Sequence, residues 1–349
     1  MTNKSIAKNS IYNVIYQGFN VFFPLISMTY FSRILLADGI GRIEYARTIV
    51  TYFLVLAMLG IPIYGVKIIA QTAFNINKKS HAFWELFYLN AISTIICSIA
   101  YYVFISSNEY FNDRRILFYI MGALLVSNIA NIDWYYQGIE DYSYITKRSI
   151  IIKITSFIFM IIFVKTYNDY MSYAIIYCIA SAGNYVFNII HLRKQIKFIS
   201  IRNCNITRHL KSVLILLCSS IATEIYTMLD TILLEYFHGE IYVGYYSNCV
   251  KIVRLIYTLS TAMVVTFYPR ISLYIKENKT EEVNNLLSKA FQILIIFVVP
   301  ASIGLFLIAD DLIPVLFGTS FLPSIRCLKI LSILVIVFSI ATMFGHIVL

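Results

Sequence analysis

The chain has 349 residues, of which 59% are apolar and only 13% are charged. A soluble protein of this length needs far more charged surface, so the composition excludes a soluble domain and predicts an all-α, polytopic helical membrane protein. The net charge is +10. The distribution of these charges along the chain indicates the orientation in the membrane, and no nucleic-acid partner is expected.

Ten segments are apolar and long enough to cross a hydrocarbon layer of roughly 30 Å, which takes about 20 residues. The first is expected to be a retained span, because its apolar run from Ile11 is too long for a signal peptide and has no small-residue cleavage site. The expected spans are 11–32, 45–66, 83–105, 116–137, 149–165, 170–191, 211–235, 243–268, 289–309 and 326–348.

The distribution of lysine and arginine sets the orientation. With the N-terminus in the cytoplasm, cytoplasmic segments hold 17 of the 28 cations, outer segments hold 8, and three lie within spans. This fits the positive-inside rule. The reverse orientation would require the strongly basic segment 191–211 to cross the membrane.

A weak internal repeat suggests two halves of the same orientation. Gly41 precedes Ile49-Val50 at the same spacing at which Gly244 precedes Ile252-Val253, a layout seen in some transporters. We therefore expect two pseudo-symmetric six-helix lobes, residues 1–200 with spans 1–6 and residues 201–349 with spans 7–10. The second lobe is expected to be incomplete, lacking about two helices, on the order of 60 residues.

Four charged residues lie inside apolar runs of the seventh and eighth spans: Glu224, Asp230, Lys251 and Arg254. A charge near the bilayer centre costs on the order of 3 kcal/mol, so such residues usually face a bundle interior or a water-filled path. Glu224 lies at a similar depth to the two cations and is a plausible partner for either. The cations suit the oxygens of a phosphate or pyrophosphate, and the acids could carry a coupling proton or sodium ion or only neutralise the cations.

Other charged residues have competing interpretations. Arg33, Arg42 and Arg47 could extend a cationic cavity or snorkel to phospholipid headgroups. Lys153 is expected to snorkel, and Asp133 with Trp134 is expected to be an interfacial anchor.

The histidines and cysteines predict no metal site and no cofactor, because they show no ligand spacing. The sequence also lacks a glycine-rich phosphate loop, a nucleophile elbow and a pair of catalytic carboxylates, so we do not expect an enzyme.

Residues 133–140, with Asp133, Trp134, Gln137, Gly138 and Glu140, resemble the bacterial polysaccharide flippases of the Wzx (RfbX) type. These belong to the multidrug/oligosaccharidyl-lipid/polysaccharide exporter superfamily, which includes the MATE-like transporters. The resemblance continues in order along the chain, in residues 10–13, 30–35, 52–53, 59–65, 225–230, 243–247 and 267–270.

The resemblance implies a multi-pass protein of the bacterial inner membrane that moves undecaprenyl-pyrophosphate-linked O-antigen repeat units to the periplasmic leaflet. Alternating access driven by an ion gradient is also implied. Together with the charges found within the spans, this gives the leading hypothesis that Lys251 and Arg254, helped by Arg33 and Arg47, hold the diphosphate. An O-antigen polymerase and a chain-length regulator are the further partners that it implies.

Two alternatives stay open at this point. A multidrug/cation antiporter of the same superfamily predicts cavities dominated by acids, whereas here cations compete with them. An O-antigen polymerase or ligase needs a large outer loop, and no connection between the expected spans is long enough for one.

Overall fold

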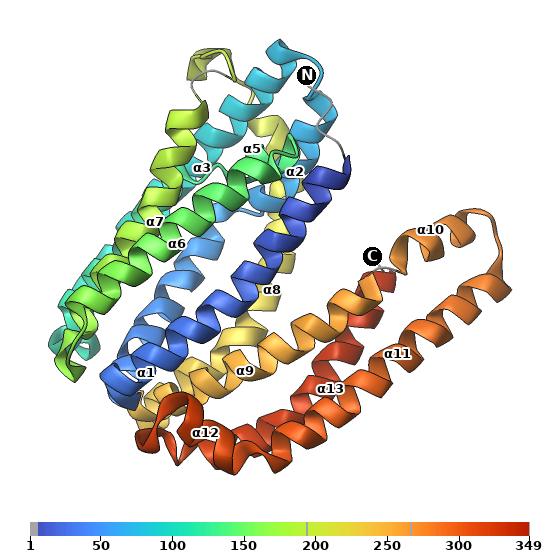
Figure 1. Cartoon of the computed structure of the whole chain (residues 1–349). Helices are drawn as coiled ribbons and strands as arrows, with labels where there is room; N and C mark the ends of the chain where they lie inside the picture. Colours follow the sequence, from blue (N-terminus) through green and yellow to red (C-terminus); the bar gives the residue numbers. More distant parts are fainter. Residues whose placement is uncertain (1–5, 193–194, 266, 349) are drawn as a thin grey trace. The chain divides into compact units, whose positions relative to one another are not determined.

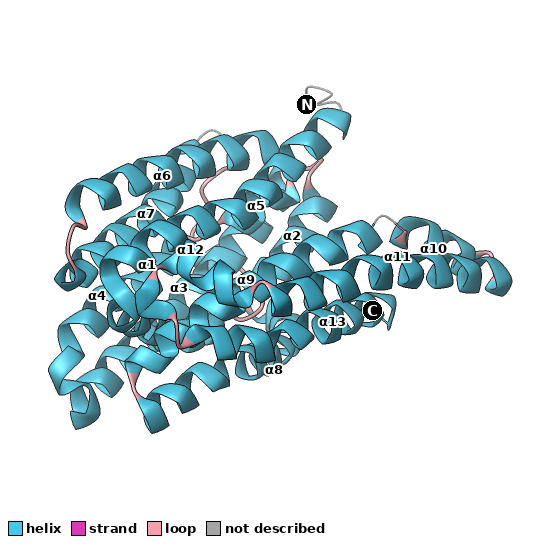
Figure 2. Ribbon diagram, turned by 60° about the horizontal axis from the view of Figure 1, so that its bottom comes forward, coloured by secondary structure: helices cyan, strands magenta, loops and turns pink. Residues whose placement is uncertain are grey.

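The computed structural model describes residues 6–192, 195–265 and 267–348, and these are helical throughout apart from short loops (Figures 1 and 2). The prediction of an all-α protein is confirmed. The α-helices are α1 (Ile6–Met58), α2 (Ile61–Thr72), α3 (Ile76–Ser107), α4 (Arg115–Ser127), α5 (Asp133–Gly138), α6 (Tyr142–Phe163), α7 (Tyr170–Leu192), α8 (Thr207–His238), α9 (Glu240–Val265), α10 (Tyr268–Lys276), α11 (Thr280–Leu307), α12 (Ala309–Phe317) and α13 (Ser324–Val348).

The first two expected spans have different boundaries in the structure. Helix α1 continues through 33–44, where a connection is expected, with one non-helical residue, Leu36, at φ 57° and ψ −176°. The segment has no proline to break the hydrogen-bond ladder, so the helix resumes after the kink. The second span, 45–66, is instead interrupted at Leu59 and Gly60, both of which have positive φ. Pro62 lies in the first turn of α2, where its missing N–H costs nothing.

One other expectation about the helices is wrong. The span 116–137 ends as an α-helix at Ser127, and the short α5 follows separately. The connection between the expected spans 243–268 and 289–309 contains α10 and the first turns of α11. Glu281 and Glu282 lie in the first turn of α11, where negative charge complements the helix dipole.

Six helical segments of the described chain are long and apolar enough to cross a membrane. They are Gly18–Thr72, Ile76–Ser107, Tyr167–Leu192, Thr207–His238, Thr280–Leu307 and Ser324–Phe344. The protein is therefore a multi-pass membrane protein, and the expected number of ten spans stays a prediction.

The chain divides into two compact units. Unit 1 comprises Met1–Asn20 and Arg42–Glu240, and unit 2 comprises Val21–Gly41 and Ile241–Leu349. Helix α1 contributes to both units. The two lobes expected from the sequence, 1–200 and 201–349, stay a prediction.

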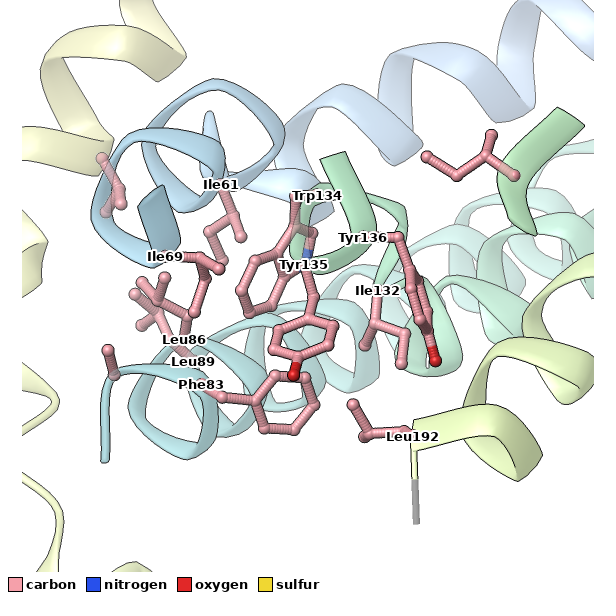
Figure 3. Close-up of a cluster of buried hydrophobic side chains, with 13 residues drawn as sticks. Ile61, Ile69, Phe83, Leu86, Leu89, Ile132, Trp134, Tyr135, Tyr136 and Leu192 are labelled. Carbon is pink, nitrogen blue, oxygen red and sulfur yellow. The ribbon is translucent and has the colours of Figure 1, made fainter. Parts of the chain in front are cut away.

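The core of unit 1 is an aromatic and aliphatic cluster around α5, which we call the Trp134 cluster (Figure 3). The rings of Phe83 and Trp134 stack with centroids 5.5 Å apart, and Tyr135 meets Phe83 edge-on at 5.4 Å. Trp134 is only 3% exposed. The expectation that Trp134 is an interfacial anchor is therefore wrong, since its ring is enclosed by neighbouring helices.

Two glycines allow helices to approach this cluster closely. A Cβ on Gly65 would lie 2.6 Å from the Trp134 ring, and a Cβ on Gly138 would lie 2.7 Å from the Cβ of Ile69. Both distances are too short for a methyl group. The contact of α2 with α5 therefore depends on glycine at both positions.

Unit 2 is held by close packing and a few buried polar contacts. Ser302 on α11 donates to the carbonyl O of Ser332 on α13 at 2.9 Å. Asn248 on α9 donates from Nδ2 to Ser32 Oγ on α1 at 2.7 Å. Such hydrogen bonds and small residues are typical of helix interfaces in membranes.

Candidate functional site

The two cations of the eighth expected span lie one turn apart on α9, in unit 2. Lys251 is half-buried and Arg254 is exposed. The hydroxyls of their neighbours bond to their own helix: Ser247 donates to the carbonyl O of Val243, and Thr258 donates to the carbonyl O of Arg254 at 2.7 Å. An ammonium and a guanidinium within one turn can bind phosphate oxygens as a point charge and a planar fork respectively.

The two acids of the seventh expected span lie on α8, in unit 1, and both are half-buried. Glu224 accepts a hydrogen bond from Thr227 Oγ1 at 3.3 Å, and Asp230 accepts one from the backbone N of Thr231 at 2.7 Å. Both carboxylates interact electrostatically with the hydroxyl of Tyr52 on α1. The pairing of Glu224 with Lys251 or Arg254 stays a prediction.

The arginines predicted to extend a cationic cavity all have protein partners. Arg33 donates to the carbonyl O of Val315 on α12, within unit 2. Arg47 donates from Nε to Glu44 Oε2 at 2.9 Å, within unit 1. These contacts neutralise or occupy part of each guanidinium, and the roles predicted for Arg33 and Arg47 stay predictions.

A buried ionic cluster in unit 1, the Arg114 network, was not expected from the sequence. Arg114 Nη1 lies 2.8 Å from Glu235 Oε1 and 2.7 Å from Glu240 Oε1. Arg42 Nε lies 3.3 Å from Glu240 Oε2, and Tyr110 donates its hydroxyl to Glu235. Glu235 and Glu240 are only 3% and 8% exposed, so each needs these partners to remain ionised.

Tyr110 lies in the 3₁₀ helix Glu109–Arg114, outside the long hydrophobic helices. Burial, and then its hydrogen bond to the Glu235 carboxylate, raise the pKa of Tyr110 to about 12. The hydroxyl therefore stays protonated as a donor at physiological pH.

A second unexpected cluster, the Arg148 network, joins α5, α6 and α7. Arg148 Nη2 lies 2.9 Å from Asp133 Oδ1, and Arg148 also donates to Asn188 Oδ1. Asn188 donates from Nδ2 to Asp133 Oδ1 at 2.7 Å, and Tyr136 donates to the carbonyl O of Asn188 at 2.7 Å. Asp133 is thus half-buried in an ion pair, and its predicted place at the membrane interface stays a prediction.

A third cluster, the Glu85 network, holds the first turn of α8 against α2 and α3. His209 Nε2 lies 2.9 Å from Glu85 Oε2, and His209 Nδ1 lies 3.0 Å from the hydroxyl of Tyr64. Arg208 Nη2 lies 2.5 Å from the same Glu85 oxygen, and the backbone N of Asn205 donates to Glu85 Oε1 at 2.9 Å. These bonds fix the segment that leads into α8.

The remaining residues of the motif form the end of α5. The backbone N of Glu140 donates to the carbonyl O of Gln137, and the backbone N of Asp141 donates to the carbonyl O of Tyr136. Glu140 has φ 57°. This is the double hydrogen bond of a Schellman cap with the left-handed residue, most often glycine, occupied by glutamate.

Lys153 on α6 does not snorkel as expected. It is half-buried, donates to Asn20 Oδ1 on α1, and lies 5.6 Å from the centroid of the Phe19 ring. An amide oxygen and an aromatic face compensate the ammonium within unit 1, so the side chain has no need to extend to the headgroups.

The described part of the chain holds no group of three or more histidine, cysteine, aspartate or glutamate side chains that could bind a metal ion.

Comparison with known proteins gives three findings. The pattern of the family described as "Polysaccharide biosynthesis protein" matches residues 6–275. A "Putative O-antigen transporter" of Escherichia coli (strain K12) is 25% identical over 354 aligned residues, covering 99% of this chain and 83% of the relative. A "Probable low-salt glycan biosynthesis flippase Agl15" of Haloferax volcanii is 24% identical over 114 residues, covering 33% of this chain and 24% of that protein.

A solved structure has the same fold. It is the inward-facing conformation of a multidrug resistance MATE family transporter of the MOP superfamily, with a TM-score of 0.71 over 95% of this chain and 82% of that one. The sequences are 12% identical, so this similarity concerns the fold alone. The expected MATE-like fold is confirmed.

Proposed function

Because the chain belongs to the polysaccharide biosynthesis protein family, whose relatives are transporters and not enzymes, we propose that it is a flippase for lipid-linked glycans. Its substrate is the undecaprenyl-pyrophosphate-linked O-antigen repeat unit, which it moves from the cytoplasmic to the periplasmic leaflet of the bacterial inner membrane. The O-antigen transporter and the glycan flippase among its relatives support this substrate class.

The observation that carries the proposal is the pair of cations one turn apart on α9. Lys251 and Arg254 lie within a helix of 26 residues in which they are the only lysine and arginine. A charge in a membrane helix is costly and is retained where it contacts water, an ion or a charged ligand. A pyrophosphate linked to a lipid is a ligand of the matching charge, and Arg33 adds a third cation in unit 2.

Glu224 and Asp230 serve as the coupling groups in this proposal. Each is half-buried on α8, and each can exchange a proton or bind sodium as the protein alternates between its two conformations. The N-terminus is cytoplasmic in this scheme, in agreement with the distribution of lysine and arginine.

The test is complementation of a strain lacking the gene. The double variant Lys251→Ala/Arg254→Ala should lose at least about tenfold of the surface O-antigen at a normal protein level, because each charge-assisted contact contributes on the order of 1.5–3 kcal/mol. Lys251→Arg should lose less, because it keeps the charge.

The matched control is Lys276→Ala/Lys279→Ala, which removes the same number of charges near the end of α10 and should leave export unchanged. Normal export by the Lys251→Ala/Arg254→Ala variant would overturn the role of these cations.

A further inference from the structure

Helix α7 has three distinct faces. One face is exposed and purely apolar, as expected for contact with lipid, and consists of Ile175, Ile179, Val186, Phe187 and Ile190. The second is buried and packs against neighbouring helices; it includes Ala174 and Cys178. The third is half-buried and carries Tyr170, Tyr173, Tyr177, Ser181 and Asn184. These five residues are spaced by three or four, so they form one continuous stripe.

The third face is unlike either of the others. A lipid-facing surface has no use for tyrosine hydroxyls and an amide in mid-helix, since polar groups in hydrocarbon are costly. A packed interface would bury these residues as fully as Ala174 and Cys178. The stripe therefore has the chemistry of a surface that contacts a polar ligand.

Helix α1 places a second polar stripe next to this one within unit 1. Glu44, Arg47 and Thr51 are half-buried on one face of α1, and the Arg47 guanidinium lies near the hydroxyls of Tyr173 and Tyr177. We call Glu44, Arg47, Thr51, Tyr173, Tyr177 and Asn184 the α1–α7 wall.

Arg42 on α1 fixes the position of the α1 stripe relative to the α7 stripe at one end. Its guanidinium lies 5.2 Å from the centroid of the Tyr170 ring and donates to the Tyr170 hydroxyl at 3.4 Å. Arg42 in turn belongs to the Arg114 network through Glu240. The two stripes are therefore held in a defined register before any ligand arrives.

The wall is better suited to sugar than to phosphate. Arg47 is neutralised by Glu44 on the preceding turn, so the pair presents donors and acceptors without net charge, which suits hydroxyl groups that both donate and accept. Tyrosine rings offer large apolar faces with a polar tip, and the faces of pyranose rings are apolar while their edges carry hydroxyls.

One atom points directly to a missing partner. Asn184 donates from Nδ2 to the carbonyl O of Ala180 at 3.1 Å. Its Oδ1 is buried and accepts no hydrogen bond from the described residues. A buried acceptor left in this state is costly, and a ligand hydroxyl would satisfy it once the Asn184 side chain turns its amide oxygen outward.

We propose that the α1–α7 wall, which lies within unit 1, is the sugar-recognition surface of this protein and contacts the glycan of the lipid-linked oligosaccharide. This inference rests on the proposed function. The aromatic and amide groups of the wall bind the sugars of the substrate and make no contact with its pyrophosphate.

The test compares binding of two lipids to purified protein in detergent by native mass spectrometry. One is the undecaprenyl-pyrophosphate-linked repeat unit extracted from the source bacterium, and the other is sugar-free undecaprenyl pyrophosphate. The variant Tyr173→Ala/Tyr177→Ala/Asn184→Ala should bind the repeat unit about tenfold more weakly, from the loss of two aromatic contacts and one hydrogen bond. Its affinity for the sugar-free lipid should be unchanged.

The matched control removes three side chains from the lipid-facing side of the same helix, as Ile175→Ala/Ile179→Ala/Val186→Ala, and should bind both lipids as the wild type does. A milder variant, Tyr173→Phe/Tyr177→Phe, keeps the rings and should lose affinity for the repeat unit by a smaller factor. This variant still tests the proposal if the triple variant does not fold.

The outcomes separate the two proposals. Equal weakening for both lipids in the wall variants, or no weakening for either, would overturn the wall while leaving the flippase function intact. Failure of the wild type to bind either lipid would overturn the proposed function itself, and the wall with it.

Discussion

The Trp134 cluster and the Arg114 network stabilise unit 1 in different ways. The first is built from aromatic rings and two glycines that admit close helix contact. The second is built from ion pairs of two arginines with two nearly buried glutamates and from the hydrogen bond that Tyr110 donates. A substitution in a packed cluster destabilises the protein by an amount that grows with the steric misfit. Removing the partner of a buried charge destabilises it strongly in one step, because the charge is left without compensation.

The residues that resemble the family most clearly are not the residues proposed to bind the substrate. The motif that identifies the family, residues 133–140, contributes Trp134 to the core and Asp133 to a structural ion pair. The cations proposed to bind the diphosphate, Lys251 and Arg254 on α9, lie outside the residues that carry the resemblance. The most recognisable part of this sequence therefore specifies the fold, and the proposed transport chemistry depends on residues elsewhere.

The largest expected effect is that of Arg114→Ala. It leaves Glu235 and Glu240, both nearly buried, with reduced compensation, and should destabilise the protein by about 3–5 kcal/mol. Thermal unfolding in detergent measures this loss. Adding Glu235→Gln to Arg114→Ala should restore part of the lost stability, because it removes one unpaired charge. If the double variant is no more stable than Arg114→Ala alone, the loss does not come from unpaired charge.

A smaller loss is expected for Gly138→Ala in the Trp134 cluster. The new methyl group would meet Ile69 and the carbonyl O of Val66, at a cost of about 1–3 kcal/mol for overpacking. Gly183→Ala on α7 is the matched control, because a Cβ there has nothing within 4 Å. Equal stability of the two variants in the same unfolding assay would show that the α2–α5 contact is not tight.

Tyr110→Phe removes one donor from the Arg114 network. The expected cost is about 1.5 kcal/mol, at the low end for a hydrogen bond to a charged group because the ring is partly exposed. The pKa of Tyr110 is raised to about 12, above the value of about 10 in an unfolded chain. The stability difference from wild type should therefore be constant from pH 5 to about 9 and shrink as the pH rises through 10 towards 12; a difference that changes near pH 7 would contradict this role.

The smallest effect is a gain. Glu140 occupies the left-handed position of the α5 cap, where glycine avoids a steric cost of about 1–2 kcal/mol but gives back up to about 1 kcal/mol in chain entropy. Glu140→Gly should therefore raise stability by about 0.5 kcal/mol. Lost export in this more stable variant would assign the carboxylate a functional role.

The sequence predicts helices well where an apolar run is continuous. The expected spans 170–191 and 326–348 correspond to Tyr170–Leu192 and Ser324–Val348 within two residues at each end. It fails where one backbone angle decides the outcome, as at Leu36 and Gly60, because neither residue type fixes positive φ from its neighbours alone.

Some charged residues of the candidate site could be predicted from the sequence and others could not. Lys251, Arg254, Glu224 and Asp230 are visible from the sequence because they interrupt apolar helices. The Arg114 network is not, because its members lie near helix ends and 121 residues separate Arg114 from Glu235. Only the three-dimensional fold brings them together, and no local pattern in one sequence marks such a pair.

The proposed function is most directly tested by locating the lipid-linked repeat units in spheroplasts of the source bacterium after deletion of the gene. The account predicts that single repeat units accumulate facing the cytoplasm and that surface O-antigen is lost, with both restored by the wild-type gene. Repeat units that reach the periplasmic face but stay unpolymerised would contradict it and identify polymerisation as the missing step.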